Sequence, residues 1–114
     1  MTAGEARFTT REAERLRGLY EAVQLFRKPD AEMTSQAISV LIDIAMRPGI
    51  TMLELADRVG LSNTATSRNI RKFLDKGGGL GLIRQEEDAD DARKKPLYLT
   101  AAGESLISGV LRSI

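Results

Sequence analysis

The sequence predicts a small, mainly helical α+β protein, and three observations lead to this class. Its 114 residues suit a single domain, expected to span 1–114. Apolar side chains recur at three- and four-residue steps through much of the chain, as they do on the buried faces of helices. Residues 82–86 and 95–99 instead read as two antiparallel strands around a charged segment that is too polar to bury. We therefore expect helices around one two-stranded ribbon.

The first half of the chain predicts two helices. One spans residues 9–28, because Thr9 and Glu12 have the spacing of a capping box and Pro29 ends the apolar periodicity. The second spans roughly residues 35–46. The side chains expected to form the apolar faces are Ala13, Leu16, Leu19, Tyr20, Val23 and Phe26 on the first helix, and Ala37, Ile38, Leu41, Ile42 and Ala45 on the second.

Two shorter helices with a turn between them are predicted next. Thr51 and Glu54 open one that continues to Val59, and Ser62 caps another that reaches about Lys76. Two short helices joined by a glycine-containing turn form a helix-turn-helix. On the second helix, the residues expected to point inward are Thr66, Asn69, Ile70, Phe73 and Leu74. The opposite face carries Asn63, Thr64, Ser67, Arg68 and Arg71, with Lys72 at its margin.

The last third of the chain predicts a hairpin and a final helix. Residues 87–94 form the projecting tip of the hairpin, and Pro96 suits an edge strand that can do without one hydrogen-bond donor. Thr100 is expected to cap the final helix, over residues 101–114. The resulting order of elements is that of a winged helix domain, with its core over residues 33–100 and a terminal helix on each side.

The composition excludes several kinds of chemistry. The chain has neither cysteine nor histidine, which removes disulfides, thiolate nucleophiles, Ser-His triads and the commonest zinc ligands. The acidic residues from Glu86 to Asp91 have no apolar neighbours to raise a carboxyl pKa, and they lack the glycine of a calcium loop. The glycines from Gly77 to Gly79 are not followed by the Gly-Lys-Ser/Thr of a phosphate-binding loop, so we expect them to form a flexible connection. We expect no enzyme activity, no catalytic residues, no metal and no cofactor.

Charge and hydropathy give weaker indications. The formal net charge of +1 does not by itself indicate a polyanionic partner. Residues 62–114 nevertheless carry nine basic and seven acidic side chains, so positive charge is slightly enriched there. The longest apolar stretch, residues 37–46, is too short to span a membrane, and the N-terminus lacks the apolar core of a signal peptide. We expect a cytoplasmic protein.

Several motifs resemble the multiple-antibiotic-resistance regulator (MarR) family. The helix-turn-helix carries Leu55-Ala56, Gly60-Leu61-Ser62, Ser67-Arg68 and Lys72-Phe73. The more specific match is Asp91-Ala92-Arg93 followed by Leu99-Thr100-Ala101-Ala102-Gly103, the spacing of the family's wing. The similarity covers about residues 33–112. Two departures are an insertion at Gly77 to Gly81 and a final helix shorter than the long dimerising helix of the family.

The resemblance implies a DNA-binding transcriptional regulator, and the residue types fit that role. An α-helix enters the major groove, where arginine pairs with a guanine edge, so Arg68 is expected to read bases. The resemblance implies that Arg93 enters the minor groove, with Asp91 orienting it or tying down the hairpin. The predicted DNA-binding residues are Ser62, Asn63, Thr64, Ser67, Arg68, Arg71 and Lys72 on the helix, and Asp91, Arg93, Lys94 and Lys95 in the wing. Of these, Arg71 and Lys72 are expected to contact phosphates.

The two terminal helices predict self-association. Their apolar residues are expected to pack against each other or across a two-fold axis. A homodimer would present two recognition helices to a near-palindromic site on double-stranded DNA, and would act there as a repressor. The residues expected to mediate dimerisation are Leu16, Tyr20, Val23, Leu106, Val110, Leu111 and Ile114.

Two further expectations concern partners. The resemblance implies an anionic or aromatic effector between the dimer helices and the DNA-binding lobe, although no residue pattern identifies such a pocket. Oxidation sensing through cysteine is excluded by composition. The alternative to DNA binding is a winged helix that binds another protein, as an adaptor or a phage- or plasmid-encoded factor; the low net charge and the acidic wing favour it.

Overall fold

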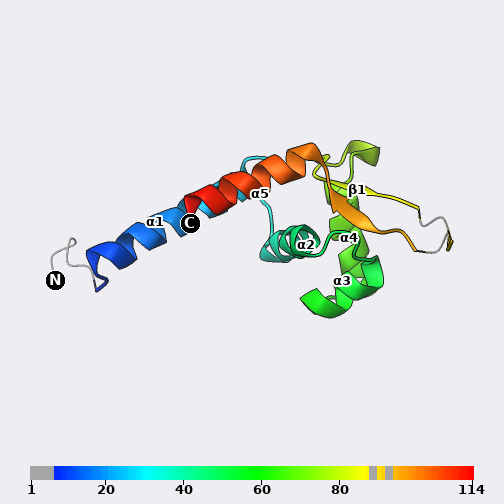
Figure 1. Ribbon diagram of the computed structural model, residues 1–114, viewed down its shortest axis with the longest axis horizontal. Coiled ribbons are helices and arrows are strands. Elements are labelled where there is room, and N and C mark those ends of the chain that lie inside the picture. The colour runs from blue at the N-terminus through cyan, green and yellow to red at the C-terminus, as the bar shows by residue number, and fades with distance from the viewer. Residues whose placement is uncertain (1–6, 88–89, 92–93) are drawn as a thin grey trace.

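The computed structural model describes residues 7–87, 90–91 and 94–114. Its main elements are α1 (Thr10–Arg27), α2 (Ser35–Met46), α3 (Met52–Val59), α4 (Asn63–Phe73), β1 (Ile83–Gln85), β2 (Leu97–Leu99) and α5 (Ala101–Ser113), with a short 3-10 turn at Lys76–Gly78. Helices α2 to α4 and the hairpin form a lobe, and α1 and α5 project from it (Figure 1). The predicted class, a mainly helical α+β protein with a two-stranded antiparallel wing, is confirmed.

Side-chain caps start the helices where the sequence places them. The hydroxyl groups of Thr9, Thr34, Thr51, Ser62 and Thr100 each accept a hydrogen bond from the backbone amide three residues later. Thr9 and Thr51 complete capping boxes with Glu12 and Glu54. These caps satisfy backbone donors that the first helical turn leaves without partners, so each start is encoded locally.

The end of α4 corrects the prediction that this helix reaches Lys76. It ends at Phe73, because the chain leaves the helix at Leu74 and makes a parallel bridge to Ile83. The amide of Leu82 donates to the Phe73 carbonyl at 2.8 Å, and that of Leu80 donates to the Lys72 carbonyl at the same distance. The segment after α4 thus satisfies the last carbonyls of the helix in place of a further helical turn.

The wing strands pair antiparallel, with Ile83 opposite Leu99 and Gln85 opposite Leu97. Leu97 also bridges to Ile50, whose carbonyl accepts from the Leu97 amide at 2.9 Å. Ile50, two residues before α3, therefore adds a single antiparallel bridge beside the two-stranded sheet. This pairing ties the wing to the start of the helix-turn-helix.

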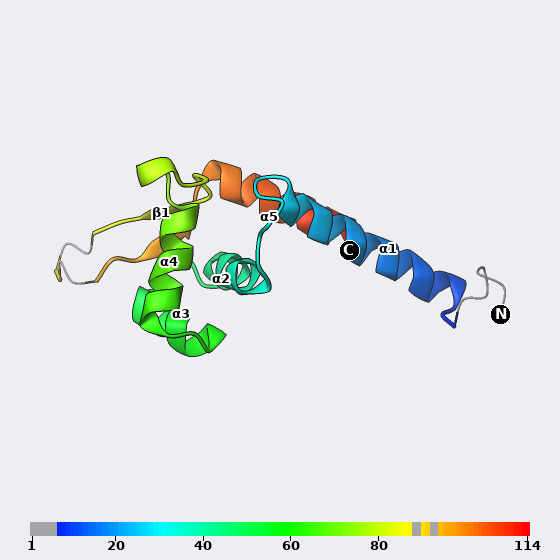
Figure 2. The same ribbon diagram turned by 180° about the vertical axis from the view of Figure 1, so that it is seen from behind.

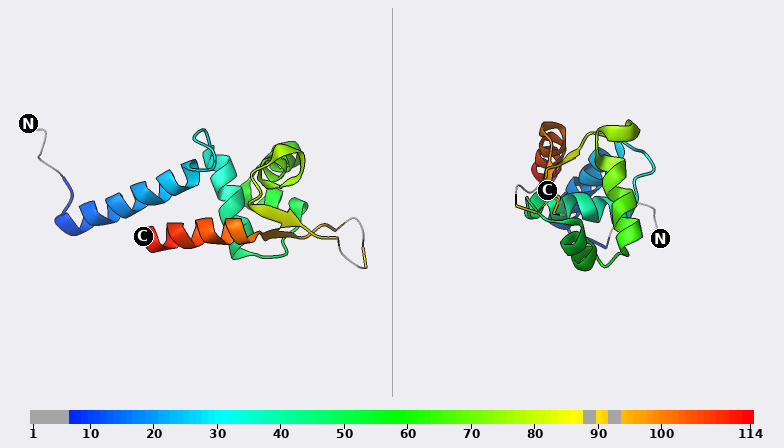
Figure 3. Two further views of the ribbon diagram at one scale, coloured as in Figure 1. Left: turned by 90° about the horizontal axis from the view of Figure 1, so that it is seen from above. Right: turned by 90° about the vertical axis from the view of Figure 1, so that its right-hand side faces the viewer.

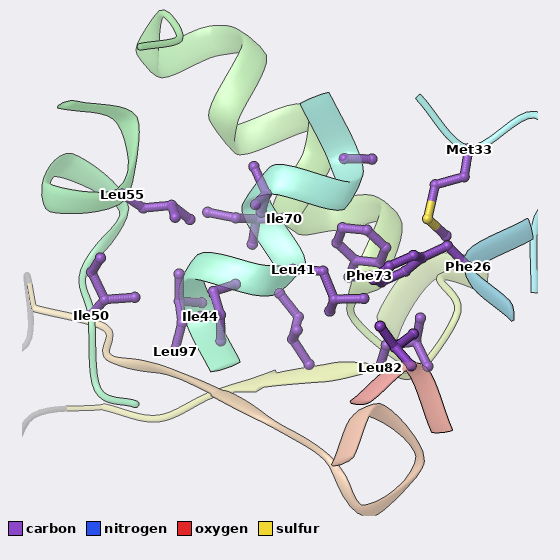
Figure 4. Close-up of a cluster of buried hydrophobic side chains, with 14 of the residues drawn as sticks. Phe26, Met33, Leu41, Ile44, Ile50, Leu55, Ile70, Phe73, Leu82 and Leu97 are labelled. Atoms are coloured by element: carbon purple, nitrogen blue, oxygen red, sulfur yellow. The ribbon is translucent and has the colours of Figure 1, made fainter. Parts of the chain in front are cut away.

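The core surrounds α2, with buried side chains from α3, α4 and the two strands packed against it (Figure 4). On α2 the fully buried apolar side chains are Ala37, Val40, Leu41 and Ile44. The predicted stripe is wrong at Ile42, which is 37% exposed, because the buried side of α2 runs through Ala37, Val40, Leu41 and Ile44 and leaves Ile42 facing solvent. The terminal helices also contribute to this core, since Phe26 of α1 and Val110 of α5 are buried in it.

Helices α1 and α5 lie side by side and extend away from the lobe (Figure 3). Their contact uses small residues: a Cβ on Gly18 would lie 2.2 Å from the Ser113 carbonyl oxygen, so only glycine permits this approach. The buried line on α1 is Gly18, Ala22 and Phe26, and the apolar face predicted from periodicity is exposed over most of its length. No helix in the described part of the chain is long and apolar enough to cross a membrane.

Candidate nucleic-acid interface

One face of α4 carries polar and basic side chains that the core leaves uncovered. Thr66, Ile70 and Phe73 are buried against the lobe, which sets the rotation of the helix. Asn63, Thr64, Arg68 and Arg71 are exposed, and Ser67 is half-exposed. Helix α4 runs along the surface of the lobe between α3 and the wing (Figure 2). The structure therefore brings together the recognition-helix residues predicted from the sequence, apart from Lys72.

The N-terminus of α4 suits an approaching phosphate. Ser62 caps it by accepting from the Ala65 amide at 3.1 Å, and the Thr66 hydroxyl donates to the Ser62 carbonyl at 2.8 Å. The first turn contains no acidic residue. A capped helix start concentrates backbone N–H groups and partial positive charge, and both attract a phosphate.

A groove of about 600 Å³ separates α4 from the wing. Arg71 lines it from α4, and Lys94 and Lys95 line it from the wing. The amide of Lys94 donates to the Asp91 carbonyl at 3.0 Å. The predicted minor-groove residue Arg93 lies outside the described residues. The described wing thus contributes two exposed lysines beside the recognition helix.

The acidic residue in this groove is held in a local hydrogen-bond network. The hydroxyl of Thr51 donates to the Glu54 carboxylate at 2.8 Å, and the Thr51 amide donates to it at 3.2 Å. These bonds, and then the charges of Lys94 and Arg47, lower the pKa of Glu54 below its ordinary value. Glu54 therefore carries a negative charge at neutral pH and offsets part of the groove's positive potential.

Glu86, the residue that follows β1, is paired within the wing. Arg84 forms an ion pair with Glu86, and its guanidinium lies 4.6 Å from the ring centroid of Tyr98 on the facing strand. This places one cation and one anion together, so the pair adds no net charge to the wing. The position also suits a cation–π contact.

Lys72 lies apart from the other predicted phosphate contacts. Its ammonium is 2.5 Å from the Asp30 carboxylate, in the loop between α1 and α2. The side chain of Lys72 is 34% exposed and that of Asp30 is 23% exposed. In this arrangement Lys72 binds the protein's own loop, and the described exposed cations of the face are Arg68, Arg71, Lys94 and Lys95.

One pair that positions the helix-turn-helix is not predicted from the sequence. Arg58 of α3 binds Asp43 of α2, a carboxylate whose side chain is only 6% exposed. The available signal is Asp43 itself, because a charged residue that interrupts an apolar stripe needs a partner when it is buried. The identity of that partner, fifteen residues away, is not visible in the local pattern.

The residues predicted to mediate dimerisation divide into two groups. Leu16, Tyr20 and Val23 of α1, with Leu111 and Ile114 of α5, are exposed in the protomer. Leu106 packs against the core and Val110 is buried in it. A shallow hollow of about 630 Å³ on the same arms is lined by Phe8, Leu16, Leu19 and Ile114 among others. The exposed group thus forms an apolar surface on the arms, outside the lobe.

Comparison with known proteins agrees with this geometry. A family model described as winged helix-turn-helix DNA-binding matches residues 38–77. The transcriptional regulator HosA of Escherichia coli O127:H6 is 27% identical, over 87% of this chain and 76% of HosA. The S. aureus MepR–DNA complex superposes with a TM-score of 0.72 at 20% identity, over 90% of this chain and 78% of that chain.

A further solved structure, of a MarR family transcription regulator, superposes with a TM-score of 0.65 at 20% identity. The match covers 90% of this chain but 64% of that regulator, so the chain spans less than two thirds of its length. The helix-turn-helix, the wing and the projecting helices define a winged helix-turn-helix protein. Within that class the fold of this chain is similar to that of the solved MarR family regulator, which agrees with the resemblance seen in its sequence motifs.

Proposed function

We propose that this protein is a sequence-specific transcriptional repressor that binds a near-palindromic operator as a homodimer. The observation that carries the proposal is the exposed face of α4, which bears Arg68 and Arg71, together with the groove that Arg71 shares with Lys94 and Lys95 of the wing. A helix of this kind fits the major groove of B-form DNA, and lysines on a neighbouring wing reach the adjacent backbone. Repression follows from occupancy, because a bound dimer blocks access to the operator.

The arms support the dimer. Tyr20 is 63% exposed, Leu111 is 63% exposed and Ile114 is 71% exposed, although all three are apolar or largely so. Exposed apolar side chains gathered on one part of a protein mark an interaction site. The occupant we assign is the same surface of a second copy, since a two-fold interface pairs identical patches. Two copies would then carry two α4 helices and two wings, as a palindromic site requires.

Selection from a randomised DNA pool tests the proposal and returns the operator. The recovered site is then titrated at two salt concentrations. We expect a near-palindromic site and an affinity that falls steeply as salt rises, because phosphate contacts release counterions. Failure to enrich any sequence at low salt, with folded protein, would contradict DNA binding and favour a winged helix that contacts another protein. A selected site with a single half-site would contradict the dimer.

Repression needs its own measurement. The selected operator is placed within a promoter that drives a reporter, and transcription is compared with and without the protein in a purified system. We expect less transcript when the protein is present, and equal transcript from a promoter whose half-sites are scrambled. An increase in transcript would identify an activator and overturn the repressor assignment.

A further inference from the structure

We propose that Lys72 is a positioning residue, whose ion pair with Asp30 sets the orientation of the recognition helix relative to the α1 arm. The inference rests on the proposed DNA binding and extends it to how the two recognition helices are spaced. It replaces the direct phosphate contact expected for Lys72 from the sequence. The pair joins residues that are 42 positions apart in the chain, one in the loop after α1 and one in the last turn of α4.

Both oxygens of the Asp30 carboxylate have partners. Oδ2 binds the Lys72 ammonium at 2.5 Å, and Oδ1 accepts from the Glu32 amide at 2.9 Å. The same loop is braced to α1 by Arg27, whose Nε donates to the Ala31 carbonyl at 3.0 Å. The carboxylate is thus fixed on a loop that is itself tied to the end of α1, and it can hold Lys72 in one direction.

The direction of Lys72 differs from that of its neighbour. Successive residues on an α-helix are rotated by about 100° around its axis. Arg71 lines the groove next to the wing, whereas Lys72 binds the loop between α1 and α2. One turn of α4 therefore places a cation in the proposed DNA-binding groove and another on the side of the arm.

An apolar contact at the same place supports the positioning role independently. Phe26 at the end of α1 and Met33 before α2 belong to the buried cluster that contains Phe73, the residue after Lys72 (Figure 4). The C-terminal end of α4 is therefore held by the arm and its loop through both packing and charge. If α1 forms the dimer interface, this junction fixes the angle at which each α4 leaves the interface.

Three variants separate a positioning residue from a phosphate contact. Asp30→Asn keeps an oxygen for the Glu32 amide but removes the charge that holds Lys72. Lys72→Gln removes the other partner, and Arg71→Gln is the matched control on the groove side. Each is titrated against the selected operator over a range of salt concentrations, and each is checked for folding by urea denaturation.

The two roles predict opposite effects of Asp30→Asn. A positioning role predicts that both Asp30→Asn and Lys72→Gln weaken binding about two- to fivefold, the range of an exposed ion pair, with an unchanged salt dependence. Arg71→Gln should lower the slope of log affinity against log salt by about 0.9 for each phosphate that the protein no longer neutralises, or about 1.8 for a dimer. If Lys72 contacts phosphate, Asp30→Asn strengthens binding by removing a competing carboxylate, and Lys72→Gln lowers the slope as Arg71→Gln does.

Half-site spacing gives a readout that a loss of stability alone would not change. Wild-type protein should discriminate the selected operator from one with an inserted base pair between its half-sites. We expect Asp30→Asn and Lys72→Gln to reduce that discrimination by at least about twofold, because α4 is then less firmly oriented.

Unchanged spacing discrimination in both single variants would overturn the positioning role while leaving the proposed function intact. Failure of the wild-type protein to bind any DNA would instead overturn the proposed function, and the positioning role with it. The wild-type titration alone therefore shows whether the proposed DNA binding or only the positioning role has failed.

Discussion

Arg58 of α3 donates from Nε to both carboxylate oxygens of Asp43 on α2, at 3.0 and 2.9 Å. The two side chains differ in exposure, because Asp43 is 6% exposed and Arg58 is 37% exposed. Asp43 also raises the pKa of Arg58 by accepting its hydrogen bond. Helix α3 is thus attached to α2 through a buried carboxylate. Because Asp43 is buried and Arg58 is not, losing Arg58 leaves a buried charge unpaired, whereas losing Asp43 leaves a cation that water can reach.

Replacing Arg58 should destabilise the fold because it leaves the buried Asp43 carboxylate without its partner. We expect Arg58→Met to lower the free energy of unfolding by about 1–3 kcal/mol, the usual cost of a buried polar group without a partner. The double variant Asp43→Leu, Arg58→Met should be more stable than Arg58→Met, because it removes the unpaired carboxylate. Urea denaturation measures both. Arg11→Met, at an exposed position of α1, serves as the control and should change stability by less than about 0.5 kcal/mol.

The arms should control the oligomeric state. We expect Leu16→Glu combined with Leu111→Glu to shift the protein to a monomer of 12.5 kDa in light scattering, because charges on the exposed apolar surface oppose its burial in a dimer. Met46→Glu is the matched control, since Met46 is 62% exposed but lies on α2 outside the arms. A wild-type protein that is already monomeric at micromolar concentration would contradict the assignment of the arms.

Alanine substitutions of Arg68 and Arg71 should change DNA binding in different ways. We expect Arg68→Ala to cost about 1–3 kcal/mol of operator affinity and to relax the base preference at one position of each half-site. Arg71→Ala should weaken binding to all sequences alike and reduce the salt dependence. Titrations against the operator and its single-base variants distinguish the two. A uniform loss with Arg68→Ala would show that it binds phosphate.

The Asp30–Lys72 pair should also give a specific pH dependence of stability. The hydrogen bond from Lys72, and then that from the Glu32 amide, lower the pKa of Asp30 below its ordinary value of 3.8. A lowered folded-state pKa means that stabilisation is present above the unfolded value and is lost as pH falls through the folded value. The stability difference between wild type and Asp30→Asn should therefore be constant from about pH 5 to 7 and shrink below about pH 4. In a Lys72→Gln background the difference should be smaller above about pH 5, where Asp30 is charged.

Alanine should destabilise the protein more at Gly79 than at Gly77, although only Gly77 has a positive φ. Gly77 has a positive φ of 67° but no atom within 4 Å of an added Cβ, so Gly77→Ala should cost about 1 kcal/mol. Gly79 has an ordinary φ of −70°, yet its Cβ would lie 1.6 Å from the Leu74 carbonyl oxygen. We expect Gly79→Ala to cost more than about 2 kcal/mol, since backbone must shift to admit it. Equal losses in thermal denaturation would contradict this order.

Local signals in the sequence were sufficient for most of the fold. Hydroxyl caps and glycine-containing turns act within a few residues, so helix starts and the order of elements could be predicted. The end of α4 could not, because it depends on Leu74 pairing with Ile83 after an intervening loop. The exposed face of α4 followed from helical periodicity alone. The role of Lys72 did not, because a basic residue at the margin of a helix gives no indication of a distant carboxylate such as Asp30.

The contribution of the terminal helices to the core limits how this protein can be divided. Phe26 and Val110 lie in the same buried cluster as Phe73 and Ile70. A fragment limited to residues 33–100 would lose those two side chains and expose the apolar surface beneath them to water. The proposed DNA-binding part therefore does not form a complete folding unit by itself: a transfer of the α4 helix and wing to another scaffold would have to include the inner ends of both arms.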